Sequence, residues 1–196
     1  QGAQSQTLEG ETRYETAVEV AKEGWSGKRD FAVLGRGDLP VDALAGSVLA
    51  NKLDTPILLT RTNALPASVE NYLKDSLNPK ATVYLLGGTT AISSNVEKRL
   101  VDLGFNIKRV SGKSRTDTSI EIAKVVGGSS QSVFFATGDE NSSDALSISP
   151  YAARNQIPII IQKGINVSQN TKDYLKNSKK TTVNLIGGSD VVSSEV

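Results

Sequence analysis

Two arginines at equivalent places in the chain have the chemistry to hold an anion. Arg13 and Arg115 each stand in the first turn of a predicted helix, where the helix dipole disfavours a positive charge. A guanidinium at such a place needs a partner, and two interpretations remain open. One is an ion pair with Asp42 or Asp144, carboxylates that also recur along the chain. The other is a contact with an anionic ligand, because the arginine fork matches phosphate and carboxylate oxygens.

Two Gly-Gly turns are the second candidate for binding. Gly87-Gly88 and Gly187-Gly188 each follow an apolar stretch and precede a predicted helix start. Free backbone N–H groups in such a turn can hold an anion. The turn can also be purely structural, because a tight turn often needs a positive φ, which glycine adopts readily. Neither GxGxxG nor the P-loop pattern is present, so we favour the structural interpretation and expect no cofactor.

The carboxylates give little support for catalysis. Asp42 and Asp144 lie at or near predicted helix starts, where a carboxylate caps the helix and complements its dipole. The pairs Asp38 with Asp42 and Asp139 with Asp144 are the only candidates for a cluster that could do acid–base chemistry or bind a metal. The chain has no Cys and no His, which excludes cysteine nucleophiles, Ser-His-Asp triads and Cys/His zinc sites. We therefore predict no catalytic residue and no metal site.

The charge of the chain is nearly balanced. Among its 196 residues, 22 are basic and 21 are acidic, so no global field calls for a nucleic acid or a membrane. Aromatic residues make up 5%, too few for the stacking platforms that bind single-stranded nucleic acid. No apolar stretch approaches the roughly 20 residues of a membrane helix. Basic residues are scattered over loops and helix ends, as is typical of a solvated surface. They include Arg36, Arg61, Arg109, Lys113 and Lys163.

The chain contains two copies of one unit. Segments 10–22 and 112–124 match at an offset of 102, with six of thirteen positions identical. Further pairs follow in the same order: DAL at 42–44 and 144–146, PILL at 56–59 and PIII at 158–161, and LLGG at 85–88 and LIGG at 185–188. Recurrence this long and this ordered indicates tandem units.

We place the first unit at residues 9–110 and the second at 111–196, after an N-terminal segment at 1–8. The second unit breaks off inside its last predicted helix. The residues QTLEG that lead into the first unit resemble the KRVSG that leads into the second. We therefore expect this chain to be part of a longer array of units.

Each unit alternates helices with strands. Thr12 with Glu15, and Ser114 with Asp117, predict a capping arrangement at the first helix of each unit. In the first unit we predict strands at 31–35, 55–60 and 106–112, a strand with its Gly-Gly turn at 81–88, and helices at 41–53, 66–77 and 92–104. Strands that alternate with helices of this length predict βα crossovers. The fold class is therefore α/β, with a small, mainly parallel sheet flanked by helices in each unit.

Four motifs in a fixed order carry a resemblance to a known family. They are Arg13 to Ala17 (RYETA), Asp42 to Ala45 (DALA), Pro56 to Thr60 (PILLT) and Val83 to Ser93 (VYLLGGTTAIS). Their order resembles the cell-wall-binding repeat type 2 family of Gram-positive bacteria. The second unit repeats the order with changes, since it has RTDTS at 115–119 and three isoleucines where the family has ILL.

The resemblance implies a secreted, non-catalytic module with a Toprim-like fold, packed in threes around a pseudo-threefold axis. Such modules hold surface-layer proteins, amidases or proteases on the cell wall or cell surface by binding an anionic polymer. That partner is a teichoic acid or a phosphate-containing polysaccharide, and neither a nucleic acid nor membrane insertion is implied. Two repeats then call for further repeats in the same chain, or for self-association. The polymer-binding candidates are Arg13, Arg115, Gly87, Gly88, Gly187, Gly188 and Lys113.

The family's ILL motif is tied to anchoring. It maps here to Ile57, Leu58 and Leu59 and, imperfectly, to Ile159, Ile160 and Ile161. These runs are also typical of a strand buried on both faces, so we expect their role to be structural. Two other functions remain open. A surface-layer scaffold would bind a partner protein, and a Toprim-like phosphotransfer enzyme would need carboxylates that converge on a metal.

Overall fold

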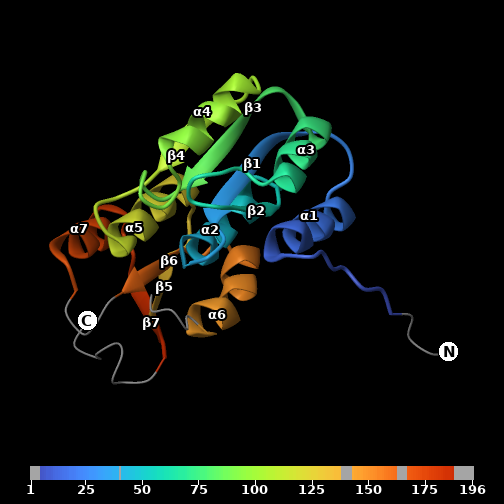
Figure 1. Ribbon diagram of the computed structural model, residues 1–196. Coiled ribbons are helices and arrows are strands. Elements are labelled where there is room, and N and C mark those ends of the chain that lie inside the picture. Colours follow the sequence, from blue (N-terminus) through green and yellow to red (C-terminus); the bar gives the residue numbers. More distant parts are fainter. Residues whose placement is uncertain (1–4, 40, 138–142, 163–166, 188–196) are drawn as a thin grey trace.

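Two small parallel sheets, one in each unit, form the framework of the protein (Figure 1). The computed structural model describes residues 5–39, 41–137, 143–162 and 167–187. The first unit contains α1 (Arg13–Gly24), β1 (Arg29–Arg36), α2 (Val41–Lys52), β2 (Ile57–Thr60), α3 (Ala67–Ser76), β3 (Leu77–Leu86), α4 (Ser94–Asp102) and β4 (Asn106–Val110). The second contains α5 (Arg115–Val126), β5 (Ser132–Thr137), α6 (Ser143–Arg154), β6 (Ile159–Gln162), α7 (Gln169–Asn177) and β7 (Thr182–Ile186). The predicted α/β class is confirmed.

The two sheets share one topology. The first has the strand order β2-β1-β3-β4 and the second the order β6-β5-β7, and all their pairings are parallel. The register is also shared when β1 and β5 are aligned at an offset of 101, because Val33 of β1 then corresponds to Phe134 of β5. Val33 faces Ile57 of β2, and Phe134 faces Ile159 of β6, the counterpart of Ile57. In both sheets the first strand of the unit therefore lies in the interior, with the later strands added on either side. The carboxyl ends of all strands in a sheet meet at one edge.

The helix starts follow the predicted capping chemistry. Thr12 and Glu15 form a full capping box at α1. At α5 the side chain of Ser114 accepts a hydrogen bond from the backbone N–H of Asp117, 3.1 Å away. Elsewhere the boundaries move by a few residues. Pro66 occupies the N-cap position of α3, so it lies just before the helix and not in its first turn. Strand β3 begins four residues earlier than predicted, before an irregularity in its pairing with β1.

Each sheet packs its own helices on one face. In the first unit, α1, α3 and α4 supply buried side chains such as Val18, Leu73 and Leu100 to a core against the sheet. In the second unit, α5 and α7 do the same with Ile120 and Tyr174. Figure 1 shows α1 with α3 at one side of the molecule and α5 with α7 at the other.

The opposite face of each sheet contributes to a core that both units share. Helix α2 lies in this shared core and contacts both α5 and α6. Leu49 of α2, Ile122 of α5 and Ile161 of β6 are each at most 1% exposed there. The two units therefore bury apolar surface against each other as a domain interior does, and the burial of apolar area is the main stabilising contribution.

An ion-pair cluster joins α3 to α4 on the surface of the first unit. Glu70 accepts hydrogen bonds from Arg99, with an Arg99 Nε to Glu70 Oε2 distance of 2.9 Å, and it pairs with Lys74 at 2.7 Å. These bonds lower the pKa of Glu70 to about 2 from 4.5. A carboxyl with a lowered folded-state pKa stabilises the fold above its unfolded pKa, and that contribution is lost as the pH falls.

The substitution Glu70→Gln is expected to remove this pH dependence. Stability should fall by about 1 kcal/mol at pH 7, after discounting for solvent screening. The variant and the wild type should converge between pH 4.5 and about 2, because the wild-type carboxyl becomes protonated over that range. Urea unfolding at a series of pH values measures the difference. A constant difference across the whole range would show that Glu70 acts through packing and not through its charge.

Candidate functional site

Five arginines gather at the carboxyl edge of the first sheet and at the start of the second unit. We call this group the arginine edge, and its members are Arg13, Arg36, Arg61, Arg109 and Arg115. Arg36 ends β1, Arg61 follows β2 and Arg109 lies near the end of β4. Arg13 and Arg115 begin the first helix of each unit, as predicted.

Arg13 lies over the end of β1. Its Nη1 donates a hydrogen bond of 2.8 Å to the carbonyl oxygen of Gly37. Gly37 cannot be another residue without a shift, because a Cβ there would lie 2.5 Å from the ring of Tyr14. The guanidinium of Arg61 stands over the same ring, 5.0 Å from its centroid. Arg13 and Arg61 are exposed, and within the described residues neither forms an ion pair.

Two other arginines of the edge are paired with acids. Arg36 forms an ion pair with Asp38, and its hydrogen bonds hold the pKa of that carboxyl below the usual value. The charge of Arg13 contributes to the same lowering, which places Arg13 near Asp38. Arg109 pairs with Glu97 at 2.6 Å and also donates to the carbonyl oxygen of Gly87 at 2.9 Å. These contacts fix the turn after β3 and reduce the net charge of the edge.

Asp42 connects the first unit to the second. It lies in the first turn of α2, and burial raises the pKa of its carboxyl. The positive charges of Arg115 and Arg36 oppose that rise, so Arg115 of the second unit acts on a carboxylate of the first. The Oδ1 atom of Asp42 is buried and has no hydrogen-bond partner within the described residues. Among the predicted partners of the two arginines, the structure therefore associates Asp42 with Arg115, while Arg13 contacts the backbone at Gly37.

The Gly-Gly turns have the geometry of the structural interpretation. Gly87 has a φ of +104° and Gly187 a φ of +126°. A Cβ on Gly87 would also lie 2.9 Å from Asp42 Oδ2. The N–H of Gly87 donates to the carbonyl oxygen of Val110 at 2.9 Å, so that group is not available to an anion. Gly88 has open space around its Cα, while Gly188 lies outside the described residues.

The remaining predicted residues lie in different surroundings. In β2, Leu58 is fully buried while Ile57 and Leu59 are partly buried. In β6, Ile159, Ile160 and Ile161 are all buried. Lys113, two residues before Arg115, lines a hollow between α5 and α7. Asp139 and Lys163 lie outside the described residues, and the side chain of Asp144 is not described.

Three residues of the arginine edge have the sequence surroundings of ordinary surface cations. These are Arg36, Arg61 and Arg109. The sequence position of two of them was informative, because Arg36 and Arg61 each directly follow a predicted strand, and the ends of parallel strands meet at one edge. Arg109 instead lies within the predicted strand at 106–112. In the described residues, no group of three potential ligands could hold a metal ion. No described helix combines the length and apolar character needed to cross a membrane.

Sequence comparison identifies one protein family along nearly the whole chain. The family described as "Cell wall binding domain 2 (CWB2)" matches residues 7–97 and 109–196. The chain is 30% identical over 187 residues to N-acetylmuramoyl-L-alanine amidase LytC of Bacillus subtilis, covering 95% of this chain and 37% of that protein. It is 36% identical over 152 residues to the amidase enhancer of the same organism, covering 78% of this chain and 21% of that protein. The chain thus spans well under half the length of these relatives.

Solved structures agree with the sequence comparison. The chain is similar to Cwp6 from Clostridium difficile, with a TM-score of 0.89 and 33% identity over 96% of this chain and 30% of the other. It is similar to Cwp8 from the same organism, with a TM-score of 0.88 and 34% identity over 96% of this chain and 32% of the other. The two small parallel sheets in tandem are therefore an arrangement found in these proteins.

Proposed function

This chain belongs to the cell wall binding domain 2 family, and on that premise we propose that it is a non-catalytic anchoring module. It tethers an attached enzyme or surface-layer protein to the wall or surface of a Gram-positive bacterium. The chain spans 37% of the amidase relative and 21% of the amidase enhancer, which leaves most of each relative for other segments. We propose that such attached segments carry the activity and that this module supplies the location.

The ligand we propose is an anionic wall polymer that binds at the arginine edge. The observation that carries this proposal is the pair of exposed guanidinium groups of Arg13 and Arg61, which form no ion pair within the described residues. Arg61 is held over the ring of Tyr14, and Arg13 is held by the carbonyl of Gly37. Both forks are therefore ordered before a ligand arrives, which reduces the entropic cost of binding. Phosphodiester oxygens match this chemistry.

We further propose that another repeat, or a second copy of this chain, covers two faces that this chain leaves exposed. On α6, Leu146 and Tyr151 are 62% and 57% exposed. The corresponding residues of α2 are Leu44 and Leu49, which pack in the shared core. On α1, Val20 is 46% exposed, whereas its counterpart Ile122 is 1% exposed. A further unit packed as the second packs on the first would cover α6, or α1.

The test is binding of the chain to purified Gram-positive walls, before and after hydrofluoric acid removes phosphodiester-linked polymers. Binding is expected to weaken with salt and to disappear after stripping, because the proposed contacts are charge-assisted hydrogen bonds to phosphate. Binding that survives stripping would point to peptidoglycan. Absence of binding to intact walls, for this chain and for a longer one with an added repeat, would contradict anchoring and favour the scaffold function.

The double substitution Arg13→Gln with Arg61→Gln is expected to weaken wall binding about tenfold, because each arginine would lose charge-assisted hydrogen bonds to the polymer. A matched control is Lys172→Gln with Lys176→Gln, which removes the same charge from exposed positions of α7. Sedimentation with walls at a fixed salt concentration measures both. Equal losses in the two double variants would mean that only net charge matters and that the arginine edge is not the site.

A further inference from the structure

A hollow lies between the same two helices in each unit. In the second unit it lies between α5 and α7 and has a volume of about 660 Å³. In the first unit it lies between α1 and α3 and has a volume of about 400 Å³. All nine residues that line the smaller hollow have their counterparts, 102 positions further on, among those that line the larger one. Both volumes suit a small ligand or a short segment of a larger one.

The lining is partly preserved between the two units. Four of the nine pairs are identical, namely Glu19 with Glu121, Lys22 with Lys124, Tyr72 with Tyr174 and Ser76 with Ser178. The other pairs keep their polar or apolar character, although Asn71 with Asp173 and Asp75 with Asn177 exchange an amide and a carboxylate.

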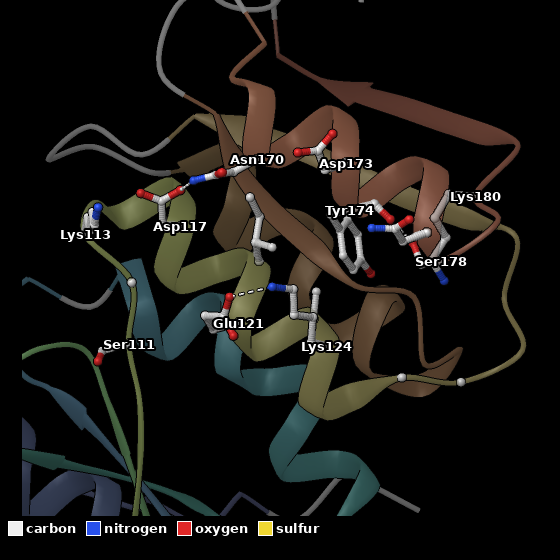
Figure 2. Close-up of a pocket in the computed structure, with 16 residues that line it drawn as sticks. Ser111, Lys113, Asp117, Glu121, Lys124, Asn170, Asp173, Tyr174, Ser178 and Lys180 are labelled. Atoms are coloured by element: carbon white, nitrogen blue, oxygen red, sulfur yellow. Dashed lines mark hydrogen bonds and ion pairs between the residues drawn. The ribbon is translucent and has the colours of Figure 1, made fainter.

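The walls of both hollows carry the same ordered polar groups. Glu19 pairs with Lys22 at 2.7 Å, and Glu121 pairs with Lys124 at 2.7 Å. At one end a carboxylate connects the two helices. Asn170 donates to Asp117 at 2.8 Å in the second unit (Figure 2), and Ser68 donates to Glu15 at 3.2 Å in the first.

The floor of each hollow is apolar with an aromatic hydroxyl. It contains Val18 and Tyr72 in the first unit, and Ile120 and Tyr174 in the second, all at most 5% exposed. Burial raises the pKa of both tyrosines. In Figure 2 the ring of Tyr174 lies between α5 and α7.

The charge of the linings disfavours a polyanion as the common ligand, because carboxylates outnumber ammonium groups in one hollow and equal them in the other. The smaller hollow has three carboxylates, on Glu15, Glu19 and Asp75, and one ammonium group, on Lys22. The larger hollow has three carboxylates and three ammonium groups. What both share is a set of carboxylate, amide and hydroxyl groups beside apolar side chains. Carboxylates accept hydrogen bonds from hydroxyl groups, and amides both donate and accept them, so the set matches a neutral polyhydroxy compound.

We propose that each hollow binds an uncharged segment of a glycan. Sugar hydroxyls would donate to the carboxylates at 15 and 19, or at 117 and 121, and a ring face would rest on the apolar floor. The proposal deepens the proposed function and rests on it in one respect, namely that the wall is the source of the glycan. The hollows are lined by residues other than the arginines that would hold phosphate. Two related sites on one chain raise the effective concentration of the second binding event.

Titration of the 196-residue chain with uncharged tetrasaccharides, followed by backbone amide chemical shifts, tests the proposal. The probes are chitotetraose, cellotetraose and mannotetraose at millimolar concentrations. At least one is expected to shift amides around Tyr72 and around Tyr174, with little change on adding salt. No shift with any of the three, or shifts confined to other surfaces, would overturn the proposal.

Two bulky substitutions assign the sites. Asn71→Trp fills the smaller hollow and Asp173→Trp the larger one, from exposed positions. Each is expected to abolish the shifts in its own hollow and to leave the other unchanged. The controls Lys74→Trp and Lys176→Trp, on the same helices but outside the linings, should leave both sites intact. The isosteric Glu121→Gln should weaken binding about fivefold in the larger hollow without adding bulk.

The outcomes separate this proposal from the proposed function. Salt-sensitive wall binding by a chain that takes up no tetrasaccharide would overturn the glycan hollows alone. Tetrasaccharide binding at both hollows, by a chain that does not bind walls, would overturn the anchoring function and leave the hollows as glycan sites.

Discussion

Replacing Ile122 with alanine is expected to lower the free energy of unfolding by about 2–4 kcal/mol. Replacing Val20, its counterpart in the first unit, with alanine should change the free energy of unfolding by less than about 0.5 kcal/mol. Ile122 is 1% exposed in the core that the two units share, whereas Val20 is 46% exposed. The two positions correspond in sequence and lie on equivalent helices, so they differ mainly in whether another unit covers them.

The fluorescence of Trp25 makes this experiment a test of coupling between the units. Trp25 is the only tryptophan, and it follows α1 in the first unit. If the shared core joins the units into one cooperative structure, Ile122→Ala in the second unit will shift the urea transition reported by Trp25. Far-UV circular dichroism should give the same midpoint. The units would instead unfold independently if the Trp25 transition stayed unchanged while circular dichroism showed a loss of structure at lower urea concentration.

The shared core also shows where sequence reasoning stopped. The repeat pattern predicted the order of helices and strands in both units, and the capping residues Thr12 and Ser114 located two helix starts. It did not predict that α2 lies between the units. The sequence of α2 does indicate this position, because VDALAGSVLANK has apolar residues on every side of the helix. A helix that is apolar all round is buried all round. A repeat unit that cannot cover such a helix alone must cover it with a neighbour.

The candidate site was predicted only in part for a related reason. Arg13 and Arg115 were found because they recur at helix starts, whereas Arg61 has no arginine at the corresponding place in the second unit, where position 163 is lysine. The hollows could not be predicted from any short stretch of sequence, because Glu15 and Ser68 are 53 positions apart and meet only when α1 packs on α3. Contacts between elements distant in sequence follow from packing, which periodicity does not encode.

Reversing the charge of Arg115 is expected to weaken the fold far more than reversing that of Arg13. Arg115→Glu places a second negative charge near Asp42, whose burial already raises its pKa, and we expect a loss of about 2 kcal/mol at pH 7. Arg13→Glu removes a hydrogen bond to Gly37 at an exposed position, and we expect a loss of less than about 1 kcal/mol. Both changes put the same acid in the first turn of a helix, so the helix-dipole contribution is matched.

The pH dependence of the Arg115→Glu variant follows from the direction of the pKa shift. An acid whose folded-state pKa is raised contributes stability below its unfolded pKa and loses it as the pH rises through the folded value. The variant raises the pKa of Asp42 further, so its deficit should be small near pH 4 and grow towards pH 7. Urea unfolding across that range measures it. A deficit that stays constant with pH would mean that Arg115 stabilises the fold through contacts other than its charge on Asp42.

Wall binding by the same two variants separates a structural arginine from a ligand-binding one. If both arginines contact the anionic polymer, Arg13→Glu should reduce binding at least about tenfold while the chain stays folded. If Arg115 acts only by offsetting the buried carboxylate of Asp42, Arg115→Glu should lose binding in proportion to its unfolded fraction, and lower temperature should restore it. Arg13 and Arg115 occupy equivalent positions in the two units, but within the described residues only Arg115 is known to act on a carboxylate of the other unit. Binding losses that do not follow stability at either position would assign both arginines to the polymer.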